Sequence, residues 1–361
     1  GSSIPKAGPI LSGYHRYASN VAAADKEQSF FDGIDISLAG IATLARGGDA
    51  GFLADGLKTM NAAVEEATAK FSAIAPGKTA PDLARGLKAT IDLLAQLDKS
   101  SLSDDAKYDI RQELEIKRAQ FNNALAEALG LAISATVAPP TEQSPLMAMF
   151  LGDPETFRAA IPGQTFGVKV HIANQSSSPV KLEHCAVEAY MQKESWPIVG
   201  EWGAPSKEIA KDQALDAKFT VTVPDDAALT RPYFTRPDIE QSYYDISDEQ
   251  FLNRPLSPYP LAAWANFSYQ GVPIRIGEYV QTVKRITGQG TVLEPLVVAP
   301  AIGVAITPRF GIVPLAEKSF PLTALVHSNV KGPAKGEVRL QLPAGWTSEP
   351  AAAPFATSDD G

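Results

Sequence analysis

Apolar positions along the chain follow two different periods, one before and one after residue 145. In the first part, apolar residues recur every three or four positions, which is the spacing of one face of a helix. In the second part, short runs alternate apolar and polar positions and are separated by Gly, Pro and Asn, as strands and their turns are. The pattern predicts a helical region followed by a β-rich region.

Four apolar stripes predict four helices in the first part. The stripes are Phe31, Ile34, Leu38, Ile41 and Ala45; Leu57, Met60, Val64, Ala67, Phe71 and Ile74; Leu83, Leu87, Ile91 and Leu94; and Ile110, Leu114, Phe121, Leu125 and Leu129. The last helix opens at Ser103, a good N-cap residue, and continues to Gly130 or slightly beyond. We expect a four-helix bundle or two helical hairpins over residues 28–138, after an extended lead-in over residues 1–27.

The second part predicts an immunoglobulin-like β-sandwich over residues 139–300. Its clearest strands carry the inward sets Phe166, Val168, Val170 and Ile172; Cys185, Val187, Ala189 and Met191; and Phe219, Val221 and Val223. Residues 301–361 offer about four strand candidates, at 303–307, 322–326 and 337–342 and after Trp346. Because a complete sandwich needs about seven strands, we predict an incomplete second β-sandwich there.

The amino-acid composition supports the division of the chain near residue 145 and limits the kinds of partner that the protein is expected to bind. All four Trp and 21 of the 28 Pro residues follow residue 145, and Pro is hostile to helix interiors. The net charge of −9 argues against nucleic acid, which rewards clustered Lys and Arg. No apolar run approaches the ~18 residues of a membrane span. We therefore expect neither a nucleic-acid partner nor a membrane span.

The residues that usually carry catalysis are scarce. A single Cys excludes an internal disulfide and a Cys-rich zinc site. The four histidines, His15, His171, His184 and His327, show no metal-ligand spacing. The sequence has no GxSxG motif and no phosphate-binding Gly loop. We expect no catalytic residue, cofactor or metal in this chain; the alternative is a hydrolase that uses carboxylates within 238–249.

Aromatic residues in two predicted loops form a candidate glycan site. Tyr243 and Tyr244 lie among five carboxylates in the segment Arg231–Gln250. Carboxylate oxygens suit calcium and tyrosine rings suit a sugar, so the segment is a candidate site for either ligand. The alternative is a long loop between strands that Tyr and Pro residues hold in place. Trp196 and Trp202 lie in SWPIVGEWG, where a Trp can stack on a glycan or cover one end of the sandwich. The candidate glycan-binding residues are therefore Trp196, Trp202, Tyr243 and Tyr244.

Three phrases of the sequence resemble a known family. QSFFDGIDISLAGIA (Gln28–Ala42) resembles the "-FEGID-" stretch that follows the catalytic domain of large bacterial PIG-L/LmbE-type deacetylases. RPYFTRP (Arg231–Pro237) and EPLVVAPAIGVAITP (Glu294–Pro308) resemble the "PYWLR" and "RPLVVAPPV" segments of their β-sandwich region. That region is similar to the NEW3 domain associated with α-galactosidases.

The resemblance implies a non-catalytic C-terminal region of such a deacetylase, which serves domain docking or glycan engagement. In that family a zinc-dependent N-terminal domain with AHPDD-type and HxxH-type motifs removes N-acetyl groups from amino sugars. Neither motif occurs here, and His15 is followed by Arg-Tyr-Ala. The resemblance therefore places zinc in a catalytic domain outside this chain, makes that domain its partner, and implies an extracytoplasmic location. The alternative is an independent carbohydrate-binding or cell-surface adhesion module.

Overall fold

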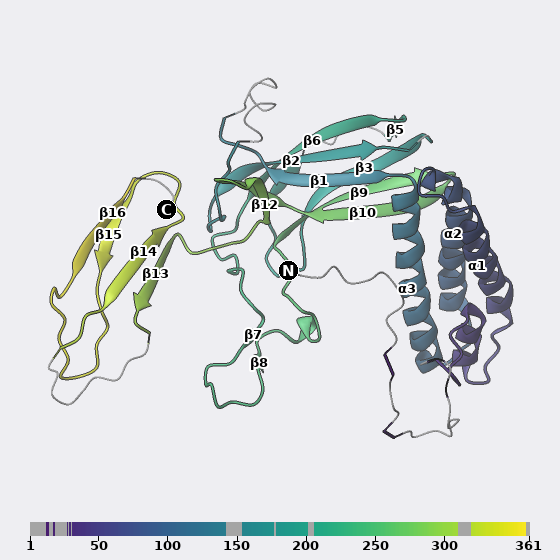
Figure 1. Ribbon diagram of the computed structural model, residues 1–361, viewed down its shortest axis with the longest axis horizontal. Coiled ribbons are helices and arrows are strands. Elements are labelled where there is room, and N and C mark those ends of the chain that lie inside the picture. Colours follow the sequence, from purple (N-terminus) through teal and green to yellow (C-terminus); the bar gives the residue numbers. More distant parts are fainter. Residues whose placement is uncertain are drawn as a thin grey trace, which may run out of the picture.

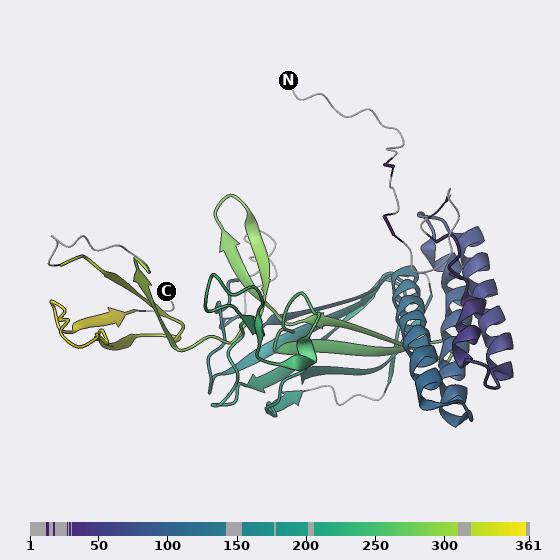
Figure 2. The same cartoon turned by 90° about the horizontal axis from the view of Figure 1, so that it is seen from below.

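The computed structural model describes residues 12–13, 17–18, 27, 29, 31–141, 154–176, 178–200, 206–309 and 319–358. In these ranges the chain is mixed α+β, and its three α-helices precede the strands. Figure 1 shows the helices at one end, two larger sheets in the middle and two small sheets at the other end, and Figure 2 shows the same order from below. No helix in the described ranges is long and apolar enough to cross a bilayer.

Three long helices lie side by side and make up most of the helical part (Figure 1). The helical elements are η1 (Leu38–Ala45), α1 (Gly51–Lys70), η2 (Pro76–Thr79), α2 (Ala80–Lys99) and α3 (Asp104–Ala128), where η marks a 3-10 helix. The Ser103 side chain accepts a hydrogen bond from the backbone N–H of Ala106, so the predicted N-cap of α3 is confirmed. The predicted helices at the second, third and fourth stripes are also confirmed.

The first predicted helix is wrong in type and in length. Only Leu38–Ala45 is helical, as a 3-10 helix, and Phe31 and Ile34 are exposed. Gly33 has a φ of +81°, in the left-handed region, and Ser37 caps η1 by accepting a hydrogen bond from Gly40 N–H. These two residues interrupt the helical backbone within the apolar stripe, which the spacing of the apolar residues does not reveal.

The second stripe also extends beyond its helix. Helix α1 ends at Lys70, and the Phe71 backbone is extended with a ψ of 132°. The side chains of Phe71 and Ile74 are therefore 67% and 97% exposed. The short connection to η2 leaves this apolar pair facing solvent.

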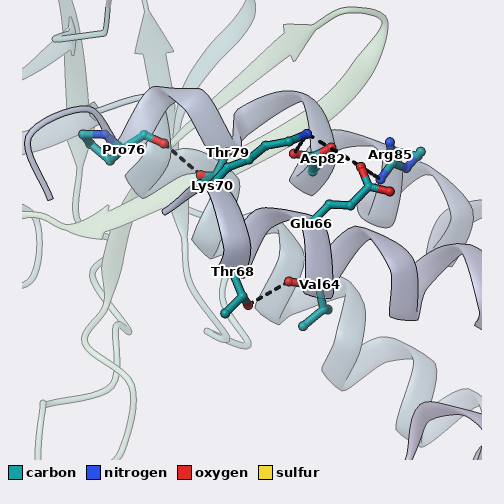
Figure 3. A network of polar contacts seen from close by, with 8 residues as sticks. All are labelled: Val64, Glu66, Thr68, Lys70, Pro76, Thr79, Asp82 and Arg85. Atoms are coloured by element: carbon teal, nitrogen blue, oxygen red, sulfur yellow. Dashed lines mark hydrogen bonds and ion pairs between the residues drawn. The ribbon is translucent and has the colours of Figure 1, made fainter. Parts of the chain in front are cut away.

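A polar network fastens α1 to α2 (Figure 3). The Asp82 side chain is 3% exposed and accepts a hydrogen bond of 2.7 Å from Lys70 Nζ, while an Arg85 nitrogen lies 3.4 Å from its other oxygen. Glu66 on α1 contacts the same two cations, at 3.6 Å from Lys70 and 3.1 Å from Arg85. The two cations thus offset the cost of burying the Asp82 carboxylate, and Glu66 shares both cations with it.

The central part of the molecule consists of two sheets. Their strands are β1 (Leu131–Val137), β2 (Thr165–Asn174), β3 (Val180–Ala189), β4 (Ile198–Gly200), β5 (Lys207–Ile209), β6 (Gln213–Thr222), β9 (Leu261–Tyr269), β10 (Val272–Tyr279), β11 (Gln281–Ile286) and β12 (Gly290–Pro295). The six-stranded sheet has the order β12-β11-β1-β2-β6-β4, and the four-stranded sheet has the order β10-β9-β3-β5. Most of the buried hydrophobic side chains of both sheets and of the helices belong to one hydrophobic cluster.

The alternation predicted for the main strands is confirmed as far as each strand extends, but β3 ends at Ala189, so Met191, predicted to face inward on this strand, lies beyond it in a left-handed turn. In β2, Phe166, Val168, Val170 and Ile172 are buried, whereas Lys169 and His171 between them are exposed. The strands β3 and β6 bury Cys185 and Val187, and Phe219 and Val221, in the same way. One face of each strand therefore contributes to the core, as a period of two requires.

Strand β1 lies inside the range 28–138 that the sequence assigns to the helical bundle. Helix α3 ends at Ala128, and Gly130 adopts a left-handed φ of +56° that stops the helix. Leu131–Val137 then pairs with β2 along its whole length, from Leu131 opposite Asn174 to Val137 opposite Val168. The helical region therefore ends about one strand earlier than predicted, because Ala and Leu in this run also suit a helix.

The last described segment forms two separate two-stranded sheets. Strand β13 (Ile302–Thr307) pairs with β14 (Thr323–Ser328), and β15 (Ala334–Val338) pairs with β16 (Ala353–Thr357). These strands lie at or near the four predicted positions. No described hydrophobic side chain after Val298 is buried.

Candidate functional site

The connection between β6 and β9 holds the unusual charged and aromatic segment. It contains two short strands, β7 (Phe234–Thr235) and β8 (Asp245–Ile246), and the single turn η3 (Glu249–Phe251). Tyr233 is buried, and its hydroxyl donates a hydrogen bond of 2.7 Å to the carbonyl of Arg254. The Ser247 hydroxyl donates to the Tyr233 carbonyl at 2.6 Å. The segment is thus a long connection held by Tyr233, which agrees with the structural alternative stated for it.

Of the four predicted glycan-binding residues, the three that the structure describes do not all lie exposed at the surface. Tyr243 and Tyr244 are 67% and 54% exposed in the turn between β7 and β8, and the Tyr244 ring packs edge-on against Phe234. Trp196 is only 6% exposed and belongs to the hydrophobic cluster, which agrees with a covering role. Trp202 lies outside the described residues. Both tyrosines are exposed, although the Arg236 guanidinium lies over the Tyr244 ring at 5.8 Å from its centroid. A glycan role for them stays a prediction.

Three aspartates of this segment, Asp238, Asp245 and Asp248, make local contacts. The Asp248 side chain accepts hydrogen bonds from Lys193 Nζ at 3.1 Å and from the Gln250 side chain at 2.9 Å. The hydrogen bond from Lys193, followed by that from Gln250, lowers the pKa of Asp248 below its ordinary value. The Asp245 side chain accepts from Gln241 at 2.9 Å. Among the described residues, no three His, Cys, Asp or Glu side chains gather as metal ligands.

His171, His184 and Cys185 lie on strands of the two central sheets, whereas His15 lies outside the described residues. His171 and His184 lie on strands of different sheets, so they are not neighbours on one surface. His171 Nδ1 lies 2.7 Å from Asp216 Oδ1 on β6. Burial raises the pKa of Asp216, but hydrogen bonds from His171 and Lys169 outweigh it and lower that pKa overall. Cys185 is buried, as its alternation with apolar neighbours predicts.

A joint between the helical unit and the four-stranded sheet centres on Asn122 of α3. Its side-chain amide donates a hydrogen bond of 2.8 Å to the Arg275 carbonyl and accepts one of 2.9 Å from the Arg275 N–H. Arg275 lies on the edge strand β10, so Asn122 binds the backbone as a neighbouring strand would. The Arg275 guanidinium lies 4.1 Å from the Trp264 ring centroid and 3.3 Å from Glu188.

Two cavities lie on the β region. The larger, about 800 Å³, is lined by Phe157, Phe166, Lys284 and Glu294 among others, and Lys284 lies 3.7 Å from Glu294. The smaller, about 170 Å³, lies between the chain after β3 and the connection that holds Tyr233 and η3. Its lining includes Glu194, which the sequence analysis did not single out, because the residues around it come from distant parts of the chain.

Comparisons with known proteins do not assign a family. No protein-family model matches the sequence, and no curated protein matches it. Solved structures that overlap part of the fold include a FixG-related protein from Vibrio parahaemolyticus, with 5% identity, coverage of 41% of this chain and 92% of that chain, and a TM-score of 0.19. PapD-like domain 7 of human CEP192 has 8% identity, covers 47% and 87% of the two chains, and has a TM-score of 0.21. Scores this low carry no argument about function.

Proposed function

We propose that this chain is a non-catalytic accessory region of a PIG-L/LmbE-type N-acetyl-sugar deacetylase, and that it serves domain docking. The observation that carries the proposal is the joint at Asn122, where one side chain holds both backbone groups of Arg275. The hydrophobic cluster continues from the helices into both sheets, so the helical unit is attached in one orientation. A region built in this way can hold a neighbouring domain in a fixed position.

The finer features of the proposal follow from the resemblance of the sequence. By this resemblance, the two central sheets form an immunoglobulin-like, NEW3-like β-sandwich. Residues 301–361 then form an incomplete second sandwich. The partner is the catalytic domain of the same protein, which holds the zinc, and the location is extracytoplasmic. Alternating burial in β2, β3 and β6 supports the sandwich.

Exposed apolar side chains on the helical unit support a docking surface. Phe71 and Ile74 extend from the end of α1, and Val64 lies on the same helix. Exposed apolar side chains such as these can be covered by a protein partner. We propose that Phe71 and Ile74 contact the catalytic domain.

The test begins with the gene. An AHPDD-type segment in the same open reading frame supports the proposal, and a frame without a catalytic domain overturns it. The catalytic domain and this chain, produced separately, should bind each other in a titration calorimeter. Phe71→Ser with Ile74→Ser should weaken that binding about tenfold or more. Val199→Ser, at an exposed residue of β4, is the matched control and should leave binding unchanged.

An independent carbohydrate-binding or adhesion module is the second candidate. The exposed rings of Tyr243 and Tyr244 favour it. A glycan array should then show binding that Tyr243→Ala with Tyr244→Ala removes. If the double variant binds glycan as well as the unchanged chain does, this pair of residues is excluded as the binding site.

A further inference from the structure

The larger cavity of the β region is a cleft between the central sheets and the last described segment. Its volume of about 800 Å³ falls within the roughly 300–1,000 Å³ of small-molecule sites. The central part contributes residues 138–140, 155–158 and 161–167 and parts of β11 and β12, whereas Val330 and Lys331 come from the chain between β14 and β15. Clefts between two structural units are common places for a ligand.

The cleft exists because the six-stranded sheet is incomplete between β11 and β2. Strand β1 lies between them in the sheet order, but it shares only one residue pair with β11, Thr136 opposite Gln281. Its register with β2 ends at Val137, and Pro139 and Pro140 have no N–H with which to extend a strand. Among the described residues, no strand continues β1 into the space between β2 and β11.

Hydrogen bonds hold two walls of this cleft in place. Beside β11, the Thr156 N–H donates to the Val283 carbonyl at 3.0 Å, and the Thr156 hydroxyl accepts from the Val283 N–H at 2.9 Å. In the last segment, the Asn329 side chain donates to the Pro300 carbonyl at 2.8 Å, and the Asn329 N–H donates to the Ala301 carbonyl at 2.9 Å. Because these walls are already fixed, a ligand does not have to order them when it binds.

The apolar lining of the cleft can be reached by a ligand. Phe157, Ile161 and Val330 all line the cleft, and each of them is only partly buried. The Phe157 ring packs edge-on against the buried Phe166 ring, with centroids 5.1 Å apart. An apolar group that lies against these side chains removes their remaining surface from water, which stabilises the complex.

Two cations of the lining have no partner in the described part of the chain. They are Arg158 and Lys331, and both residues are exposed. The other charged residues of the lining make contacts: Glu155 accepts a hydrogen bond of 2.8 Å from a backbone N–H of β11, and Lys284 lies 3.7 Å from Glu294. Three cations thus face two carboxylates, and the two cations without a partner favour an anionic group on the ligand.

We propose that this cleft binds a small amphiphilic carboxylate. Its charged end pairs with Arg158 and Lys331, and its apolar end lies against Phe157, Ile161 and Val330. A neutral or cationic ligand of the same shape would leave both cations without a partner. The proposal does not depend on the docking role of the helical unit, because none of these residues lies on that unit.

The experiment is a titration of the full chain with octanoate, followed by NMR amide shifts. Octanoate should shift amides within residues 155–158, 161–167 and 330–331. Octanamide and octylamine have an apolar chain of the same length without the negative charge, and they should bind at least about tenfold more weakly. Acetate keeps the charge but has almost no apolar part, and it should also bind at least about tenfold more weakly.

A pair of substitutions tests the two cations. Arg158→Gln with Lys331→Gln should weaken the binding of octanoate about tenfold or more, because both changes remove a cation from the cleft. Both residues are exposed, so this variant should keep the fold of the unchanged chain. Lys58→Gln with Lys207→Gln is the matched control, since it removes the same charge at exposed residues of α1 and β5, and it should leave the binding unchanged.

Any of five outcomes overturns the proposal. These are no shift of the named amides with octanoate, equal affinity for octanamide or octylamine, equal affinity for acetate, equal affinity of the Arg158 and Lys331 variant and the unchanged chain, and an equal loss of affinity in the control variant. If the catalytic domain does not bind this chain in the docking experiment, these results are unaffected, so the two proposals fail separately.

Discussion

Asp82 is a buried carboxylate whose charge is balanced by two cations that reach in from solvent. Lys70 and Arg85 are each about half exposed, whereas the Asp82 side chain is 3% exposed. We expect Asp82→Asn to lower the free energy of unfolding by about 1–3 kcal/mol, because the amide cannot satisfy both cations. Urea denaturation measures the change. Asp92→Asn, which breaks an exposed pair with Lys88, should cost less than about 1 kcal/mol, and equal costs would contradict the argument.

The single thiol allows a second test at the scale of one residue. Burial raises the pKa of Cys185 from 9.0 to about 12, so the native thiol carries almost no thiolate at neutral pH. Since the unfolded thiol ionises near pH 9, its contribution to stability is complete below that pH and is lost as the pH rises toward 12. A disulfide exchange reagent should react slowly with the native chain and rapidly in urea. Equal rates in both conditions would show that the thiol is accessible.

The lining of the smaller cavity shows why the surroundings of a single residue are hard to predict from the sequence. The aromatic and acidic composition of residues 231–250 made Tyr243 and Tyr244 candidate binding residues, and both are exposed in the turn between β7 and β8. Glu194 is distinguished only by its buried Oε2 atom, which has no hydrogen-bond partner. Both properties depend on walls that come from four separate segments. A pattern within one segment of the sequence cannot express them.

At the scale of elements, the contact between α2 and α3 depends on the absence of a side chain. A methyl group on Gly86 would lie 2.6 Å from Phe121 Cζ, well inside contact distance. Gly86→Ala gains up to about 1 kcal/mol in helix propensity but overpacks the interface by about 1–3 kcal/mol. We therefore expect a lower midpoint of thermal unfolding, measured by circular dichroism. Gly51→Ala, at the exposed first residue of α1, is the control, and a midpoint raised by both changes would refute the close packing.

The elements show where periodicity succeeds as a predictor and where it fails. Helix α3 was predictable because Ile110, Leu114 and Leu125 repeat on one face and all three are buried. The helix predicted from the stripe that begins at Phe31 does not form over its whole length, because Gly33 and Ser37 adopt non-helical backbone conformations within it. Strand β1 was missed because helix α3 runs almost directly into it, and only the left-handed Gly130 separates them. Apolar spacing identifies the buried side only where a regular element forms, and backbone conformation decides which element that is.

At the scale of the whole molecule, Asn122 links the helical unit to the sheets. We expect Asn122→Ala to cost about 1–3 kcal/mol in the free energy of unfolding, since two hydrogen bonds to Arg275 are lost. It should also speed hydrogen exchange at the Arg275 amide, whose proton the Asn122 side chain accepts. Asn61→Ala, which breaks an exposed contact with Glu65, is the control. Unchanged exchange at Arg275 would show that the joint opens in solution.

We expect the segment 301–358 to contribute nothing to the thermal stability of the rest of the molecule. Its two sheets have two strands each, and no described hydrophobic side chain in it is buried. Two-stranded hairpins alone are marginally stable in water. A chain that ends at Pro300 should therefore unfold at the same temperature as the full chain. Limited proteolysis should cut first between 301 and 358, because exposed Leu325 and Trp346 are not held in a core. A lower unfolding temperature for the shortened chain would mean that these small sheets stabilise the central ones, and their exposed apolar side chains would then need another explanation.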